Sequence, residues 1–201
     1  NTQVLKELGA DLVAIHTHPT GTNINDHCGS THMEQLAQRV RDEKADIGIA
    51  FDGDADRMLA VDENGNMVDG DQIMAICANF MKKQGTLKKN TVVVTVMSNL
   101  GFTLMGEREG LHIATTQVGD RYVLERMKAE GYNIGGEQSG HIIFLDSNTT
   151  GDGMLSALRL LEVMVTEKKP LSELASVMEV LPQALVNAHV PNDRKTSYND
   201  Y

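Results

Sequence analysis

The chain has 201 residues, a hydrophobic fraction of 41%, a charged fraction of 23% and a formal net charge of −10 at pH 7. This length is enough to bury one large core or two small ones. The acidic balance excludes a broad basic surface for nucleic acid, and the lack of Trp makes base stacking a poor prospect. No apolar run approaches the ~20 residues that cross a bilayer, so no membrane-spanning role is expected. Cys28 and Cys77 form neither a disulfide framework nor a metal pattern, and we expect both to be reduced in a cytoplasmic protein.

The first part of the chain predicts a short unit that ends in a hairpin. In order, its pattern predicts a helix end closed by Gly9, a strand at 11–16, a polar loop at 17–30, a helix from Thr31 to about Glu43, and strands at 46–51 and 58–62. The start of the helix rests on Thr31-x-x-Glu34, which matches a capping box. Asn64-Gly65 is a strong hairpin signal that returns the chain through residues 67–68.

The second part alternates strands and helices more regularly. Its pattern predicts a helix from about Asp71 to Lys83, a strand at 92–96, a helix capped by Asn99 and ended by Gly110, a strand at 113–116, a helix capped by Asp120 and ended by Gly131, strands near 133–135 and 141–145, a helix from Asp152 with Leu155, Leu158, Leu161 and Val165 on one face, and a short helix opened by Pro170. The continuous apolar run at 92–96 is typical of a buried parallel strand. We therefore predict an α/β fold with mixed, largely parallel sheets flanked by helices.

The hairpin is also the predicted domain boundary. We expect one domain over residues 1–65 and a second over residues 66–182, both near the small end of the usual size range. Residues 183–201 are polar and aperiodic, which is typical of a linker toward a further domain.

A run of alternating carboxylates lies between the strands predicted at 46–51 and 58–62. Asp52, Asp54 and Asp56 are separated by residues with almost no side chain, and Arg57 closes the run. Three carboxylates so close together repel one another unless a positive charge lies between them. Mg²⁺ and Ca²⁺ prefer such oxygen ligands, so the run predicts a divalent-cation site.

This run has two other interpretations. A solvated acidic loop without a ligand stays open on spacing alone. An EF-hand would take its first three ligands from the three aspartates and its twelfth from Glu63, but its sixth position requires Gly and is Arg57 here. Because strands rather than helices flank the run, we reject the EF-hand.

Two further stretches carry polar groups beside glycines. Residues 135–141 place Glu137, Ser139 and His141 in a loop with three glycines, which suits contacts with a sugar, although a polar turn stays open. Residues 115–121 join a strand end to a helix start, where Gly119, Asp120 and Arg121 form a candidate anion site. A capped helix with an exposed arginine is the plainer alternative. The histidines at 16, 18, 27 and 32 lack the spacing of a structural zinc site.

These stretches together resemble the α-D-phosphohexomutase superfamily, and within it the branch that acts on glucosamine phosphates. The resemblance is carried by residues 52–57 as a metal-binding loop, 136–141 as a sugar-recognition loop, and by 118–122 and 21–30. It implies a phosphohexomutase-type, four-domain isomerase that interconverts glucosamine 6-phosphate and glucosamine 1-phosphate through an enzyme phosphoserine. It leaves room for a homodimer of the full-length enzyme.

The resemblance also implies roles for the candidate residues. Asp52, Asp54 and Asp56 would hold Mg²⁺, and Arg57 would stabilise the phosphoryl group in transit. Glu137 and Ser139 would bind sugar hydroxyls. His141, together with Gly119, Asp120 and Arg121, would lie close enough to assist proton movement or phosphate binding.

The sequence departs from the superfamily in what it lacks. Neither the serine loop nor a C-terminal phosphate clamp is found in it. We therefore expect a central fragment that comprises the C-terminal part of domain two (1–65), all of domain three (66–182) and the start of the linker to domain four. We expect no mutase turnover from it by itself. Two alternatives stay open: a haloacid-dehalogenase-like phosphatase that uses Asp52 as nucleophile, and a metal-stabilised module that binds sugar phosphates.

Overall fold

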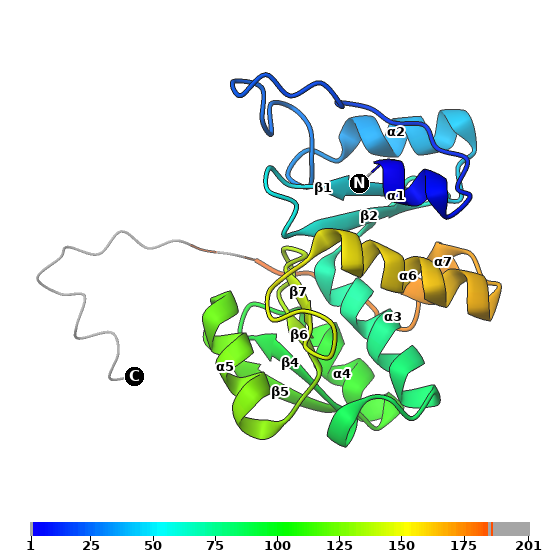
Figure 1. Ribbon diagram of the computed structural model, residues 1–201. Helices are drawn as coiled ribbons and strands as arrows, with labels where there is room; N and C mark the ends of the chain where they lie inside the picture. The colour runs from blue at the N-terminus through cyan, green and yellow to red at the C-terminus, as the bar shows by residue number, and fades with distance from the viewer. Residues whose placement is uncertain (1, 185, 187–201) are drawn as a thin grey trace, which may run out of the picture.

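The computed structural model describes residues 2–184 and 186, which form two sheets with helices around them (Figure 1). The elements are, in order, α1 (Thr2–Glu7), α2 (Glu34–Glu43), β1 (Ile47–Phe51), β2 (Met58–Asp62), β3 (Met67–Val68), α3 (Gly70–Lys83), a 3₁₀ turn (Lys88–Asn90), β4 (Thr91–Thr95), α4 (Leu100–Glu109), β5 (His112–Thr116), α5 (Asp120–Glu130), β6 (Ile134–Gly136), β7 (Ile142–Phe144), α6 (Gly153–Glu167) and α7 (Leu171–Ala175). The expected mixed α/β class is confirmed.

The first sheet is antiparallel, in the order β1-β2-β3. Every residue of β2 is buried because both faces of the strand are covered. Leu59 and Val61 pack with Val40 beneath α2, while Met58 and Ala60 point to the other side and join the main core. Figure 1 shows α2 above this sheet and α6 below it. This strand therefore belongs to two hydrophobic clusters at once.

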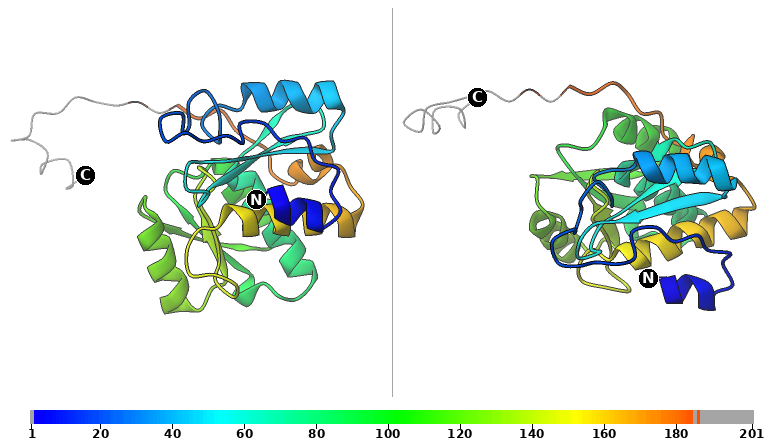
Figure 2. Two further views of the ribbon diagram at one scale, coloured as in Figure 1. Left: turned by 45° about the horizontal axis from the view of Figure 1, so that its top comes forward. Right: turned by 90° about the horizontal axis from the view of Figure 1, so that it is seen from above.

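The second sheet has the order β5-β4-β6-β7. β4 pairs in parallel with both β5 and β6, and β7 closes the sheet antiparallel to β6. The described strands are therefore mixed but not largely parallel as predicted, because the first sheet is wholly antiparallel. One face packs against α3, with α4, α6 and α7 around it, and the other face packs against α5. The burial of all five residues of β4 follows from this double cover. The two views in Figure 2 show the same layering.

Most predicted ends of elements are confirmed. Gly65 adopts the positive φ of +86° that the hairpin requires, and the αL residue after α4 is Gly110. Asn99 caps α4 by accepting a hydrogen bond from Gly101 N at 3.0 Å. Gly131 ends α5, and Pro170 precedes α7, as the pattern indicated.

Two predicted features in the first unit are wrong. Residues 11–16 form no strand, because no strand of the described residues lies beside them to take their hydrogen bonds. Thr31 does not cap α2: Met33 stands at that position in helical geometry without a side-chain bond. Met33 is buried in the cluster beneath α2, so packing rather than capping sets where this helix begins.

Two helix expectations in the second unit also need correction. Asp120 is the first residue of α5 rather than its cap, which is Gly119. On α6, Val165 is 74% exposed, and the buried face runs through Ser156, Ala157 and Leu160. This face combines the small residues Ser156 and Ala157 with Leu160 and Val163, so a search for large apolar residues alone places it wrongly.

The last two observations concern the predicted linker and the length of the helices. The predicted linker at 183–201 lies largely outside the described residues. Among the described helices, none has the length and apolar character that a bilayer crossing would need.

Candidate functional site

The acidic loop joins β1 to β2 at one end of the first sheet. One carboxylate oxygen from each of Asp52, Asp54 and Asp56 lies within 4.8 Å of the others. The loop is shaped by its own backbone, since Ala55 adopts a φ of 61° and Arg57 N donates to Asp52 Oδ1 at 3.2 Å. The three side chains predicted as ligands are therefore brought together.

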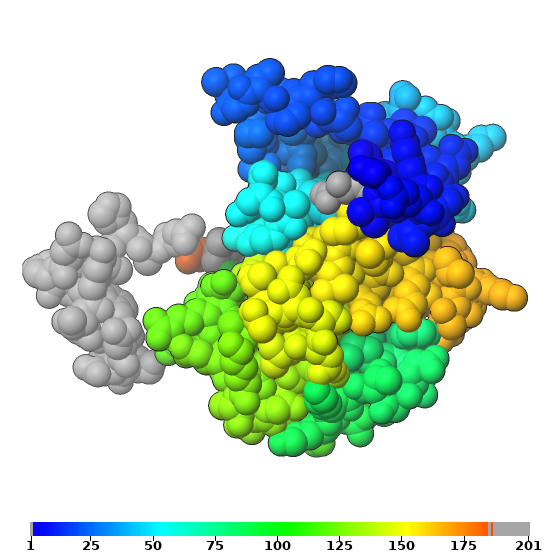
Figure 3. All heavy atoms as spheres, in the orientation of Figure 1, coloured from blue at the N-terminus to red at the C-terminus, as the bar shows by residue number. Residues whose placement is uncertain are grey.

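The start of α6 fixes the loop from outside. Gly153 N donates to Ala55 O at 2.9 Å, and a Cβ on Gly153 would lie 2.7 Å from Arg57 O. Only a glycine fits at this contact. In the space-filling view the loop, in cyan, borders the yellow segment that leads into α6 (Figure 3).

The chemistry of the acidic loop fits a hard divalent cation. Burial, a hydrogen bond with Asp52, and repulsion from Asp52 and Asp54 all raise the pKa of Asp56, and only His141 opposes them. A cation among the three oxygens would relieve this repulsion. Among the described residues this is the one group of acidic, His or Cys side chains close enough to hold a metal ion. Glu63, the twelfth residue of the rejected EF-hand, instead accepts hydrogen bonds from Ser172.

His141 connects the acidic loop to the second sheet. Its Nε2 lies 3.6 Å from Asp56 Oδ2 and 3.9 Å from Asp120 Oδ2, and its side chain is 5% exposed. Its Nδ1 is buried and has no hydrogen-bond partner within the described part of the chain. Gly151 makes room for the ring, because a Cβ there would lie 2.4 Å from it. His141 is thus held between two carboxylates from different elements.

The loop predicted to contact a sugar follows β6. Glu137 Oε1 accepts a hydrogen bond from Gly119 N at 3.0 Å, so the start of α5 holds a carboxylate of the protein itself. Ser139 Oγ lies 3.5 Å from Glu137 Oε2 and is exposed. The two polar groups of the loop are therefore neighbours at the surface.

Arg57 and Arg121 differ in their surroundings. Arg57 is exposed, and its guanidinium forms no hydrogen bond or ion pair with any described residue. Arg121 is 81% exposed in its side chain and pairs with Glu125 at 2.7 Å along α5. The structure thus brings Gly119 and Asp120 to the site but leaves Arg121 paired on the helix surface.

Sequence reasoning missed the groups that support these loops. Asp69 caps α3, and it and Gln72 form the capping box, so α3 begins one residue before the prediction. The pattern Asp69-x-x-Gln72 was a usable signal for it. Gly151 and Gly153 carried no signal, because close backbone approach depends on packing between distant segments.

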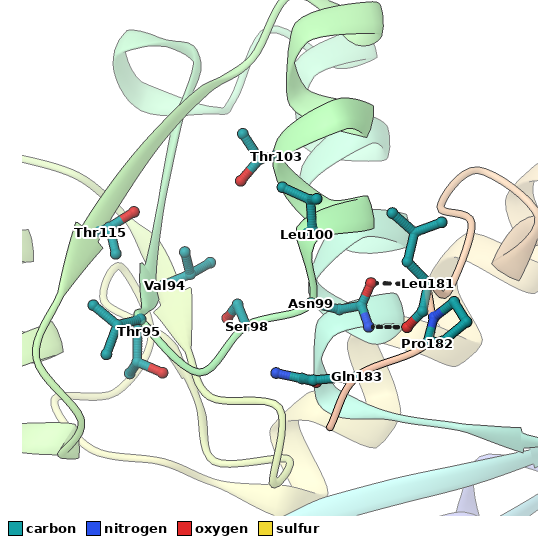
Figure 4. A pocket seen from close by; sticks show the side chains of 11 residues that line it. Val94, Thr95, Ser98, Asn99, Leu100, Thr103, Thr115, Leu181, Pro182 and Gln183 are labelled. Atoms are coloured by element: carbon teal, nitrogen blue, oxygen red, sulfur yellow. Dashed lines mark hydrogen bonds between the residues drawn. The ribbon is translucent and has the colours of Figure 1, made fainter. Parts of the chain in front are cut away.

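A cavity of about 380 Å³ lies at the ends of β4 and β5, beside the start of α4 (Figure 4). Ser98, Thr103 and Thr115 contribute hydroxyls to its lining. Asn99 closes one side by exchanging two hydrogen bonds with the backbone of Leu181, at 2.8 and 3.0 Å. The segment after α7 is thereby tied to the start of α4.

Comparison with known proteins places the chain in one family. Residues 69–181 match the family model described as phosphoglucomutase/phosphomannomutase, alpha/beta/alpha domain III, and residues 2–65 match domain II of the same family. A phosphoglucosamine mutase of Ruminiclostridium cellulolyticum is 62% identical over 98% of this chain, and one of Clostridioides difficile is 56% identical over 98%. The chain spans 44% of the length of each of these curated relatives.

A solved structure shows the same fold. A phosphoglucomutase/phosphomannomutase family protein of Burkholderia thailandensis superposes with a TM-score of 0.78 at 26% identity, over 92% of this chain and 40% of that one. The predicted phosphohexomutase-type fold is thus confirmed. Since a family model covers more than half of the sequence, the chain belongs to the phosphoglucomutase/phosphomannomutase family.

Proposed function

We propose that the full-length protein is a phosphoglucosamine mutase, an isomerase that interconverts glucosamine 6-phosphate and glucosamine 1-phosphate. One observation carries the proposal: His141 lies between Asp56 of the acidic loop and Asp120 beside the Glu137 loop, so the two loops share one site. The high identity to phosphoglucosamine mutases over almost the whole chain supports the same substrate class. The phosphoserine would come from a segment that this sequence does not contain.

In this proposal each candidate residue has a distinct task. Asp52, Asp54 and Asp56 would hold Mg²⁺, which when bound would supply positive charge against phosphoryl oxygens. The Arg57 guanidinium forms no hydrogen bond or ion pair with any described residue, so it would be available to contact the transferred phosphoryl group. His141 would give or take a proton at Nε2, the atom that faces both carboxylates.

Glu137 and Ser139 would receive the sugar. Glu137 Oε1 accepts from the N–H of Gly119, while Oε2 accepts a long hydrogen bond of 3.5 Å from the exposed Ser139 hydroxyl, and this exposed pair would face a ligand. A carboxylate and a hydroxyl side by side suit adjacent hydroxyl or amino groups of a hexosamine. We assign Gly119 and Asp120 to the support of this site, and a role for Arg121 would require it to leave Glu125.

The proposal extends to the domain layout. We assign residues 1–65 to the C-terminal part of the metal-binding domain and residues 66–182 to the sugar-binding domain, and family matches that end at 65 and begin at 69 support this division. Residues 183–201 would lead on to a further domain.

Glu137→Gln in the full-length protein tests the assignment. The wild type with Mg²⁺ should convert glucosamine 6-phosphate to glucosamine 1-phosphate, as followed by ³¹P NMR. Gln retains an oxygen for the N–H of Gly119 but loses the charge, so kcat/KM should fall on the order of 10- to 100-fold with thermal stability preserved.

Glu130→Gln is the matched control, because it makes the same change at a surface ion pair, with Arg126, at the other end of α5. It should leave turnover unchanged. Full activity in Glu137→Gln would contradict the sugar assignment. Phosphate release with a covalent adduct at Asp52, in place of isomerisation, would favour the phosphatase alternative.

A further inference from the structure

The Glu137–Gly140 loop lies directly on the first turn of α3. Gly70 N, at the start of α3, donates to Gln138 O at 3.0 Å. A Cβ on Gly70 would lie 2.3 Å from Glu137 O, 2.7 Å from Gly140 N and 2.8 Å from Gln138 O. Three backbone atoms of the loop thus occupy the space that a side chain at position 70 would need.

A side-chain contact fixes the same loop at its centre. Gln138 Nε2 donates to Asp69 Oδ2 at 3.1 Å. The other oxygen, Asp69 Oδ1, accepts from Gln72 N at 3.0 Å as the cap of α3. One carboxylate therefore both begins the helix and holds the loop, and a hydrogen bond to a charged acceptor is stronger than a neutral one.

The other backbone hydrogen bonds of the loop join its ends. Met58 N donates to Gly140 O at 3.1 Å, Glu137 N donates to His141 O at 3.0 Å, and Gly140 N donates to Glu137 O at 3.0 Å. None of these bonds involves Gln138, at the centre of the loop. Gly119 N restrains the Glu137 carboxylate, and the contacts of Gln138 with described residues outside the loop are those with the start of α3.

We infer that Asp69 and Gly70 form a seat for the sugar-binding loop, and that Asp69 is a positioning residue that acts through Gln138 on Glu137 and Ser139. The inference rests on the proposed function for the identity of the ligand but not for the geometry of the seat. In this arrangement Asp69 would act without contacting the ligand, since its two carboxylate oxygens bond to Gln72 N and Gln138 Nε2. It limits where Glu137 Oε2 and Ser139 Oγ can stand, so that both meet one hexosamine ring.

Gln138→Met in the full-length protein tests the inference. Met has nearly the shape of Gln but cannot donate to Asp69. We expect kcat/KM for glucosamine 6-phosphate to fall about tenfold, the effect of losing one hydrogen bond to a charged group. Hydrogen exchange at Gly119 N and Gly140 N, which both bond to Glu137, should become faster. Mg²⁺ affinity should stay unchanged.

Two companion variants separate positioning from helix stability. Gln72→Met makes the same substitution on the other partner of Asp69 and removes half of the capping box. It should lower thermal stability but leave kcat/KM and loop exchange unchanged. Asp69→Asn retains the cap, and its amide can donate to Gln138 once that amide turns over, so near wild-type kinetics are expected.

For Gly70→Ala, helix propensity and the contact with the loop predict different outcomes. Ala favours a helix over Gly, so an effect on the helix alone would raise thermal stability. The seat instead predicts a displaced loop, faster exchange at Gly140 N and loss of turnover. A stabilised variant with unchanged kinetics would overturn the inference.

The exchange readout distinguishes this inference from the proposed function. If Gln138→Met leaves both exchange and kcat/KM unchanged, Asp69 does not position the loop. If exchange becomes faster but the wild type does not isomerise glucosamine 6-phosphate, the seat stands and the proposed function fails.

Discussion

Asp71 is fully buried in the first turn of α3, where it ties two segments together. Its carboxylate accepts hydrogen bonds from Ser98 Oγ at 2.9 Å and Asn99 N at 2.7 Å. Its pKa is raised to about 6 as the net result of burial, which raises it most, the hydrogen bond from Asn99 N, which lowers it, and the charge of Asp69, which raises it. Asp71 therefore anchors the loop before α4, but its ionised carboxylate destabilises the folded state near neutral pH.

Asp71→Asn should stabilise the protein at neutral pH. Because the folded pKa lies above the unfolded value of 3.8, the folded state binds more protons between the two values, and stability falls as the pH rises through that window. Asn can accept from Asn99 N with its oxygen and donate its amide N–H to Ser98 Oγ, so it replaces both contacts without a charge. The gain should be up to roughly 3 kcal/mol near pH 7.5 and should vanish below the unfolded pKa, as measured by urea unfolding.

Asp146→Asn is the control, because its effect on stability at neutral pH should have the opposite sign. Hydrogen bonds from Lys88 and Asn133 hold the pKa of Asp146 below its usual range, so its contribution is present at neutral pH and lost as the pH falls. This variant should be less stable than the wild type near pH 7.5 and should match it in acid. A pH-independent effect of Asp71→Asn would contradict the assigned cause.

Asp54→Asn should weaken Mg²⁺ binding. The change removes one of three charges from oxygens that lie within 4.8 Å of one another. We expect the dissociation constant to rise at least about tenfold in isothermal titration calorimetry. Asp42→Asn, which removes an equal charge from the surface of α2, should leave it unchanged. Equal affinities in the two variants would remove the acidic loop as the site.

At the level of elements, α4 shows how one side chain can serve two purposes. Asn99 caps the helix through Gly101 N and also pairs with both backbone groups of Leu181 (Figure 4). A Cβ on Gly101 would lie 1.8 Å from Glu179 O, so the segment after α7 passes directly over this turn. The start of α4 is thus also the anchor of that segment.

Two substitutions at Asn99 should separate these purposes. Ser can still cap the helix but is too short to reach Leu181, while Ala does neither. Asn99→Ser should lower the free energy of unfolding by about 1–3 kcal/mol, and Asn99→Ala by about 1 kcal/mol more, as measured by urea unfolding. Equal losses in both variants would mean that the cap contributes nothing.

At the scale of the whole molecule, β2 joins the two sheets. Met58 and Ala60 lie in the main core with residues from α3, α4, α6 and α7, although their strand belongs to the first sheet. Glu63, just after β2, also accepts hydrogen bonds from Ser172 of α7. The family matches divide the sequence near residue 65, but the packing crosses that division.

This shared core predicts one cooperative unfolding transition. Met58→Ala leaves a cavity at a fully buried position and should cost about 3 kcal/mol. Hydrogen exchange should show equal loss of protection in β1 and β4. Val40→Ala opens a cavity in the cluster beneath α2 and should likewise lower the exchange protection of both β1 and β4. Loss of protection confined to the first sheet would show that the two units unfold separately.

The sequence alone determined the local features of this protein. The hairpin at Gly65, the cap at Asn99 and the buried run of β4 each depend on residues close together in the chain, so propensity and pattern are sufficient to predict them. The acidic loop was found for the same reason, since its three carboxylates lie within five residues.

Only the tertiary structure decided which distant groups meet. The strand predicted at 11–16 is absent because a strand needs a partner beside it, and α2 begins where Met33 is buried rather than at Thr31. The place of His141 between Asp56 and Asp120, and the seat that Asp69 and Gly70 make for the Glu137 loop, join residues far apart in sequence. Such contacts follow from how helices pack on sheets, and no local pattern of residues encodes them.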